Sequence, residues 1–162
     1  MKTVKRILTG ATVFAFVLGG VISNPGFAQE GSDPSSIPPA LPPVQSQGQT
    51  EYLTGGIGTD ESEAILQAAR AWPLVLELAQ NGPTRAAYIS DVSVTIKDGS
   101  GKIILDTITQ GPFLLVRLAP GRYSLDASYE SKTLHRDVNI GKAGSSRIVL
   151  LWPAPGKEGD SR

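Results

Sequence analysis

Short runs in which apolar and polar residues alternate dominate the second half of the chain. The clearest run reads YSLDASYE and begins at Tyr123, with every second residue apolar. Successive side chains of a β-strand point to opposite faces of its sheet, so this period of two is typical of a strand with one buried face. LVLELA from Leu74, VSVTIK from Val92 and the more mixed TLHRDVNI from Thr133 follow the same pattern. Three further runs, KIILDTI, FLLVRL and RIVLLW, are apolar enough to be covered on both faces.

Turn-forming residues separate these runs at short intervals. Glycine accepts the positive φ of tight turns and proline presets the first φ of a turn, so each cluster can reverse the chain. The clusters are Asn81-Gly82-Pro83, Asp98-Gly99-Ser100-Gly101, Gln110-Gly111-Pro112, Ala119-Pro120-Gly121, Glu130-Ser131-Lys132 and the stretch 141–145. Strands at this spacing predict a mainly β fold, an antiparallel β-sandwich of about seven strands preceded by one short helix.

The first 28 residues predict a secretory signal peptide. MKTVKR is positively charged, ILTGATVFAFVLGGVI is apolar, and the small residues Gly26 and Ala28 form a cleavage site after Ala28. The alternative is an uncleaved anchor, since the apolar run approaches the length that spans a bilayer, but its three glycines favour cleavage. We therefore expect a periplasmic or secreted protein with no membrane span after cleavage.

Charge and composition exclude several classes of function. Loss of Lys2, Lys5 and Arg6 with the signal reduces the 15 basic residues to 12, against 15 acidic ones, so nucleic acid is not an expected partner. The chain has no cysteine, which excludes disulfides, thiolate chemistry and Cys-based zinc sites. Its stability is expected to come from a packed core.

Composition also predicts the domain boundaries. Residues 29–50 are rich in Pro, Ser and Gln and are predicted to be a linker. Residues 51–72 combine a glycine-rich segment with a short helix, 73–153 form the sandwich domain, and 154–162 are predicted to be a flexible tail. The ordered part corresponds to one small domain.

The glycine-rich segment YLTGGIGTDESEAI raises the possibility of a phosphate loop. Gly55, Gly56 and Gly58 precede a helical pattern, but no Lys or Arg follows until Arg70. A Walker-type loop needs a Lys at its end, and a dinucleotide loop needs a buried strand within a βαβ unit. The segment is therefore interpreted as the entry to a helix.

The residues after these glycines suit a helix start. Acidic residues follow Thr59 and favour the positive end of the helix dipole, and Asp60 with Glu63 resembles a capping box. The helix is expected to run to about Arg70 and to lay one apolar stripe on the sandwich, formed by Ile65, Ala68, Ala69 and Trp72. The alternative is that the loop is a docking surface, made by Gly55, Gly56, Gly58, Asp60 and Glu61.

The stretch from Asp91 to Tyr129 resembles the carboxypeptidase regulatory-like domains, which are small transthyretin-like (prealbumin-like) β-sandwiches. In that family a strand, an Asp-Gly turn, a Gly-aromatic step and a Leu-x-Pro-Gly-x-Tyr turn follow in order. The matching positions are Val92, Val94, Asp98, Gly101, Gly111, Phe113, Leu118, Pro120, Gly121 and Tyr123, and the resemblance extends loosely to Trp152. Together with GGIGTDE, the stretch is similar to a group of exported bacterial proteins. The resemblance implies a fold and structural turns, at Asp98, Gly101, Gly111, Pro120, Gly121 and Tyr123, but no catalytic site.

No catalytic or metal-binding constellation stands out. His135 is the single histidine and lies in the polar register of its strand, where a solvated role is expected. Asp98 and Asp106 could form a carboxylate pair, but Asp98 lies in a glycine-rich turn and is interpreted as a hairpin former. The expectation is a non-enzymatic protein with no cofactor and no metal.

Four aromatic residues support an alternative function. Trp72 and Trp152 each precede a proline and close an element, so a role in the core or over an edge is favoured. If Trp72 and Trp152 were instead exposed on one face of the domain, they could form a sugar-binding platform with Tyr88 and Tyr129. The sequence thus predicts a non-catalytic exported module that binds an envelope or secreted protein; the alternative is a carbohydrate-binding module with a polysaccharide partner.

Overall fold

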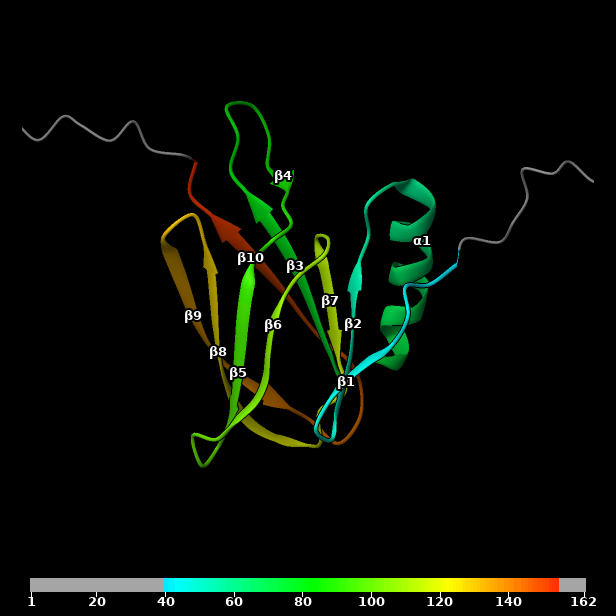
Figure 1. The fold of residues 1–162 in the computed structure, drawn as a ribbon, viewed down its shortest axis with the longest axis vertical. Helices are drawn as coiled ribbons and strands as arrows, with labels where there is room; N and C mark the ends of the chain where they lie inside the picture. Colours follow the sequence, from blue (N-terminus) through cyan, green and yellow to red (C-terminus); the bar gives the residue numbers. More distant parts are fainter. Residues whose placement is uncertain (1–39, 155–162) are drawn as a thin grey trace, which may run out of the picture. The chain divides into compact units, whose positions relative to one another are not determined.

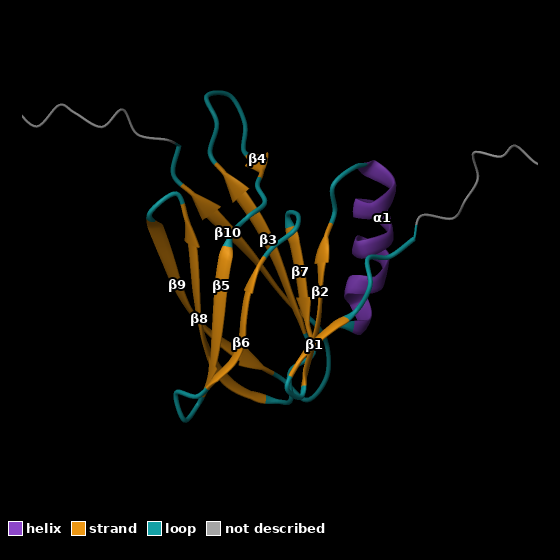
Figure 2. Cartoon of the chain, viewed as in Figure 1, coloured by secondary structure: helices purple, strands orange, loops and turns teal. Residues whose placement is uncertain are grey.

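The computed structural model describes residues 40–154, which form two β-sheets and one short helix (Figures 1 and 2). The predicted mainly β sandwich is confirmed. The predicted signal peptide, the linker up to residue 39 and the tail from residue 155 lie outside the described residues. No helix among the described residues has the length and apolar character needed to cross a membrane.

The larger sheet has six strands and forms one layer of the sandwich. Its order is β1-β2-β7-β3-β10, and the short β4 pairs with the end of β3. Every pair is antiparallel except β3 with β10, which run parallel from Leu74 opposite Ser146 to Gln80 opposite Trp152. The bounds are β1 Gln45–Gln47, β2 Thr50–Gly55, β3 Leu74–Gln80, β4 Ala87–Tyr88, β7 Phe113–Val116 and β10 Ser146–Trp152.

The smaller sheet has four strands and is antiparallel throughout. Its order is β6-β5-β8-β9, and the long hairpin of β8 and β9 turns at Glu130 and Ser131, both with positive φ. The bounds are β5 Ser93–Asp98, β6 Ile103–Ile108, β8 Gly121–Tyr129 and β9 Lys132–Ile140.

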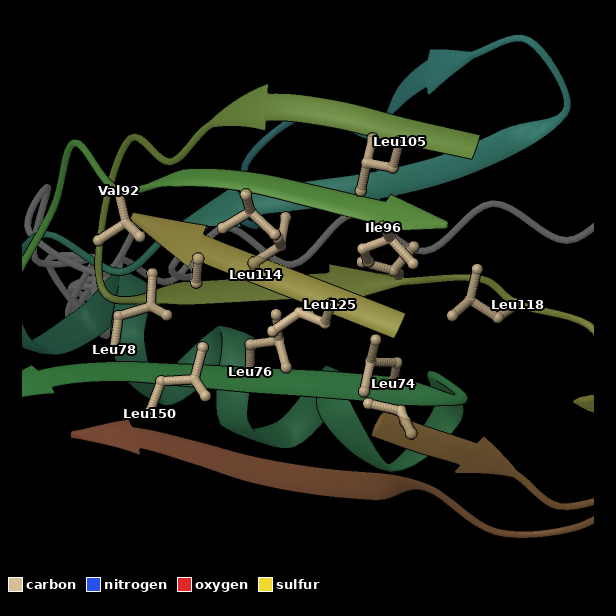
Figure 3. Packing of buried hydrophobic residues seen from close by; sticks show 14 of the residues in the cluster. Leu74, Leu76, Leu78, Val92, Ile96, Leu105, Leu114, Leu118, Leu125 and Leu150 are labelled. Atoms are coloured by element: carbon tan, nitrogen blue, oxygen red, sulfur yellow. The ribbon is translucent and has the colours of Figure 1, made fainter. Parts of the chain in front are cut away.

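The main core lies between the sheets (Figure 3). Leucines of β3 and β7 meet the inward residues of β5, β6 and β8, and Trp152 closes one end with 1% of its surface exposed. These inward residues are the apolar members of the alternating runs, as the sequence predicts. The labelled members in Figure 3 are Leu74, Leu76, Leu78, Val92, Ile96, Leu105, Leu114, Leu118, Leu125 and Leu150.

A second, smaller core lies on the other face of the six-stranded sheet. The helix α1 (Thr59–Ala68) and the short 3-10 turn η1 (Ala69–Ala71) connect β2 to β3. Their apolar stripe packs on outward residues of β2, β3 and β7, which explains why β7 reads as a continuous apolar run. Strand β3, expected from its alternation to bury one face, is buried on both. The members of this core are Leu53, Ile65, Ala69, Trp72, Val75, Phe113 and Leu115.

Three details differ from the sequence prediction. Residues 40–154 form ten strands rather than about seven, because β1 and β2 form within the predicted linker and glycine-rich segment and β4 is only two residues long. The helix therefore follows two strands instead of preceding all of them. Strands β3 and β10 can pair in parallel because the chain between them, which includes β4 to β9, is a long crossover connection. Local periodicity carries no information about pairing between such distant segments.

The predicted turn residues behave differently from one another. Asp98 Oδ1 accepts hydrogen bonds from Ser100 N (2.9 Å), Ser100 Oγ (2.6 Å) and Lys102 N (3.1 Å), and Gly101 has φ +85°, so this hairpin turn is confirmed. The Ser100 bonds hold the pKa of Asp98 below its usual value. Gly121 follows Pro120 but begins β8 without a positive φ, and a Cβ there would meet only the Tyr123 ring at 3.6 Å or more. The turn at Gly121 therefore does not depend on a positive φ.

Candidate functional site

The loop between β2 and α1 takes its shape from glycines. Gly56 and Gly58 have φ values of +98° and +96°, a region that residues with a side chain rarely adopt. A Cβ on Gly56 would overlap the Phe113 ring, whereas one on Gly58 would meet no atom within 4 Å. Gly56 therefore allows the loop to lie against the buried Phe113.

A second glycine contact brings a distant segment to this loop. Gly111, just before β7, lies so close to Gly55 that a Cβ on Gly111 would overlap the Gly55 backbone. A Cβ on Gly55 would in turn overlap the Glu61 carboxylate and the Pro42 ring. Beside this contact, Gln110 N donates to Thr54 Oγ1 at 3.0 Å. The loop is thus held at Gly55 by the close approach of Gly111 and by the side chains of Glu61 and Pro42.

The first turn of α1 fastens the loop through Glu61 and Ser62. Gly56 N donates to Glu61 Oε1 at 2.8 Å, and Ser62 Oγ donates to Gly56 O at 2.7 Å. Gly58 is the N-cap residue and no side chain caps the helix, so the predicted Asp60–Glu63 capping box is wrong. Glu61 turns back to the loop, while the Asp60 side chain is exposed.

A hollow of about 560 Å³ lies beside this loop, and we refer to it as the loop groove. Two large apolar side chains border it, Ile57 with 69% and Tyr88 with 59% of their surface exposed. The Tyr88 ring packs at a tilt on Phe113, with 5.4 Å between ring centroids. The groove is lined by Gly56, Ile57, Gly58, Thr59, Ser62, Tyr88, Ile89, Ser90 and Pro112.

The structure thus joins residues that sequence reasoning assigned to two different hypotheses. The glycine segment was the candidate docking surface and Tyr88 a candidate sugar contact, yet Gly56 and Gly58 line the loop groove together with Tyr88. Of the other candidate docking residues, Gly55 and Glu61 line a separate hollow and Asp60 lines neither. Ile57 was missed, although an apolar residue between two turn glycines is a signal for an exposed apolar side chain. The sequence did not indicate that β4 would bring Tyr88 to the groove, because a two-residue strand shows no periodicity.

The proposed four-residue sugar platform does not form. Trp72 is 5% exposed and lies in the second core with Arg117 stacked over its ring at 4.6 Å, and Trp152 is 1% exposed. Trp152 Nε1 donates to Lys132 O at 3.0 Å, and its ring meets the half-buried Tyr129 edge-on at 6.1 Å. Burial raises the pKa of Tyr129. Of the four aromatics, Tyr88 alone is exposed, because the other three fill space behind or between the sheets.

The turn residues line a second hollow, of about 620 Å³, at the end of β5. Asp98, Gly101 and Tyr123 contribute to it, together with residues of β8 and β9. Two of its polar groups belong to turns: Asp98 Oδ1 caps its own turn, and Tyr123 OH donates to Ala119 O at 2.8 Å. These two groups therefore have a structural role in the turns.

His135 lies on the exposed face of the four-stranded sheet between two carboxylates. Its Nδ1 is 2.7 Å from Asp126 Oδ1 and its Nε2 is 3.7 Å from Asp137 Oδ1, while Lys97 Nζ is 3.1 Å from Asp126 Oδ2. Hydrogen bonds from His135 and Lys97 hold the pKa of Asp126 below its usual value. The solvated strand position predicted for His135 agrees with its 60% side-chain exposure.

The pairing of His135 with Asp126 was missed by sequence reasoning, although the register of the hairpin could have revealed it. Both residues lie on the polar side of their strands, and a turn at Glu130-Ser131 places them directly opposite each other. The nearby hydroxyls of Ser128 and Thr133 bond to each other at 2.7 Å. Between residues 40 and 154, no group of three or more His, Cys, Asp or Glu side chains could hold a metal ion.

No protein-family model matches this chain, and no curated protein matches it either. A function must therefore be inferred from the geometry of the chain itself. The loop groove is the place where exposed apolar side chains, a fixed backbone and a hollow coincide.

Proposed function

We propose that this chain is a non-catalytic exported binding module that holds a short apolar segment of another envelope or secreted protein in the loop groove. The observation that carries the proposal is the exposure of Ile57 and Tyr88 on the borders of one hollow. Large apolar side chains that remain in water at a concave site are typical of contact surfaces, and Tyr is enriched among residues that dominate binding energy.

The backbone of the groove supports this proposal because it is already ordered. Gly56 is bonded through both its N–H and its carbonyl, and the Phe113 ring beneath it is fully buried. A groove that need not reorganise loses less conformational entropy when a partner binds, so more of the contact energy appears as affinity.

Charge favours a partner segment with Lys or Arg beside its apolar residues. No Lys or Arg lines the groove, and Asp60 stands exposed at the adjacent first turn of α1. Within residues 40–154, Asp60 makes no ion pair. A cation on the partner would therefore gain attraction without competing with an existing pair.

The rest of the proposal follows the same features of the sequence. The charged, apolar and small-residue order of residues 1–28 supports export to the periplasm or the medium. A two-sheet sandwich supports the resemblance to carboxypeptidase regulatory-like domains, which we retain as part of the proposal. Asp126 pairs with both His135 and Lys97, which supports a structural role for these side chains and a non-catalytic function for the chain.

The proposal can be tested by site-specific crosslinking in cells, followed by binding measurements. A photo-crosslinking residue at Ile57 should capture a protein that the same residue at Ile108, on the outer face of the four-stranded sheet, does not capture. The two positions are matched in exposure, at 69% and 63%. The crosslinked segment, made as a synthetic peptide, is then titrated into the purified protein.

The peptide should bind at least about tenfold more weakly to the Ile57→Asp and Tyr88→Ala variants, and equally well to Ile108→Asp. Unchanged affinity in the two groove variants, with the fold intact by circular dichroism, would refute the proposal. Binding of a polysaccharide that is lost in Tyr88→Ala but kept in Ile57→Asp would favour the carbohydrate-binding alternative, which the exposed Tyr88 ring keeps open.

A further inference from the structure

Apart from the two-residue β4, the two sheets have four edge strands, and three of them are protected against pairing with another chain. Strand β1 is three residues long and polar. The edge of β6 is covered where Asp106 N donates to Gln47 Oε1 at 2.6 Å. Strand β9 carries charged side chains along its length. Short strands, covering segments and charges are the means by which proteins block edge pairing.

Strand β10 is the fourth edge and lacks these protections. It spans seven residues, SRIVLLW, contains no proline, and has Arg147 as its one charged residue. On the side away from β3, no strand of the described part of the chain pairs with it. Its neighbour β9 belongs to the other sheet and lies close to it without pairing, and Trp152 Nε1 donates to Lys132 O there.

The parallel register determines which backbone groups of β10 point to the open edge. Ser146 N donates to Pro73 O at 2.8 Å, and Trp152 O accepts from Asn81 N at 2.9 Å, so the residues at even positions bond to β3. In a parallel ladder, alternate residues turn both backbone groups to the same neighbour. The N–H and C=O groups at positions 147, 149 and 151 therefore point away from the sheet.

The side chains of the same three residues lie on the outer face of the sheet, beyond the cover of α1. Val149 is 55% and Leu151 is 42% exposed, whereas the second core covers β2, β7 and part of β3. Arg147 is tied to Glu77 in an ion pair. The edge thus combines free backbone groups with an apolar, nearly uncharged surface.

We propose that β10 pairs antiparallel with β10 of a second copy of this chain, about a two-fold axis at Val149. Val149 is the midpoint of the strand, so all seven residues find a partner: 146 lies opposite 152, 147 opposite 151, and 149 opposite itself. The three edge-facing residues then meet edge-facing residues of the second copy. This match makes the strand self-complementary and favours a second copy over an unrelated strand.

Charge supports the antiparallel arrangement. Each Arg147 lies opposite the second copy's Leu151, and the two Arg147 residues are four positions apart, about 13 Å along the strand. That separation exceeds the screening length of about 8 Å at physiological salt, and each arginine is already paired with Glu77. A parallel alignment would place Arg147 beside its own copy, where like charges repel.

The first test measures self-association of the purified protein by sedimentation velocity, from nanomolar to high micromolar concentration. We expect a monomer–dimer equilibrium. Val149→Lys should weaken the dimer about tenfold or more, because two lysines would meet at the axis. Ile108→Lys, on the other sheet and of similar exposure, is the matched control and should leave dimerisation unchanged. A monomer at every concentration would refute the proposal, as would equal weakening by both variants.

The second test uses the absence of cysteine to check the register. Val149→Cys should form an intermolecular disulfide rapidly, because opposite residues of an antiparallel pair have Cα atoms about 5.5 Å apart, within disulfide range. Leu151→Cys and Ile108→Cys should crosslink only slowly, since their copies lie far from each other in the dimer. Equal rates at the three positions would refute the pairing even if Val149→Lys failed to fold. Leu151 and Tyr88 of the loop groove flank Ala79 of β3 on opposite sides. The dimer tests change Val149 and the groove tests change Ile57, so this proposal can fail while the proposed function holds.

Discussion

On the outer face of the six-stranded sheet, β2, β7 and part of β3 lie beneath α1, whereas the outer face of the four-stranded sheet is open to water (Figure 2). Strand β7, FLLV, is buried at every residue because both its faces are covered. Strand β8, in contrast, buries Leu125 and Ala127 and leaves the intervening positions partly exposed. The two sheets share one core, yet their sequence patterns differ because only one has a second layer over it.

Ion pairs differ between the two faces in the same way. Arg147 pairs with Glu77, whose side chain is 9% exposed, at the margin of the covered face. Lys97 pairs with Asp126 on the open face, with side chains 37% and 31% exposed. Exposed pairs contribute little to stability, while loss of one partner of a buried carboxylate costs more. The covered face is therefore where substitutions should have the larger effects.

The largest expected effect comes from Phe113 in the second core. Phe113→Ala should reduce the free energy of unfolding by about 3–5 kcal/mol, because it removes a fully buried ring between the sheet, Gly56 and the helix. Ile108→Ala, an apolar residue on the open face, should change it by about 0.5 kcal/mol or less. Urea unfolding of both variants measures the difference; equal effects would remove the contrast between the two faces.

A smaller effect is expected where the loop approaches the strand. Gly111→Ala should destabilise the fold by about 1–3 kcal/mol, since its Cβ would overlap the Gly55 backbone. Gly99→Ala, in the β5–β6 turn of the other sheet, is the control, because its Cβ would meet Arg122 O at an ordinary 3.6 Å. Chemical denaturation compares the two, and a Gly111 variant as stable as the Gly99 variant would contradict the close approach.

The smallest effect concerns the open face and depends on pH. The pKa of Asp126 is held below its ordinary value of 3.8 by His135 and then Lys97. A carboxyl whose folded-state pKa is depressed stabilises the fold above its unfolded pKa, about 4, and this contribution is lost as the pH falls through the folded value. Thermal midpoints should therefore fall less steeply below about pH 4 in Asp126→Asn than in the parent.

His135→Ala is the companion variant on that face. At pH 7 we expect it to change the free energy of unfolding by about 0.5 kcal/mol or less, since the ring is largely exposed and its pairs are screened by water. A loss comparable to that of Phe113→Ala would show that the open face contributes as much as the covered one.

Local patterns predicted the one-sided burial of β8 and the hairpin turn at Asp98. The runs KIILDTI and RIVLLW, expected to be covered on both faces, each expose one face in β6 and β10. Local patterns also predicted the helix start near Thr59 and the stripe that covers the sheet, because periods of 2 and 3.6 are properties of a single segment. The count of strands was too low, since β1 and β4 are too short to show a period. The capping box was wrong because Glu61 bonds to Gly56, a contact set by the path of the loop.

The candidate site was predicted only in part. The sequence indicated Gly55, Gly56 and Gly58 as an exposed loop, but Gly55 and Gly56 are buried. It did not indicate that Ile57 and Tyr88 would border a groove with Gly56 and Gly58. It also suggested a sugar platform that burial of Trp72 and Trp152 prevents. The edge exposure of β10 could not be predicted, because RIVLLW looks the same in a central strand as in an edge strand.

The sequence by itself determined the class of the fold, the positions of most strands and the absence of disulfides. These depend on residue type and on spacing within one segment. The tertiary structure decided which segments meet: the parallel pairing of β3 with β10, the contact of Gly111 with Gly55, and the placing of Tyr88 beside Ile57. Such contacts join residues distant in the chain, and they are selected by the packing of the whole sandwich rather than by any local pattern.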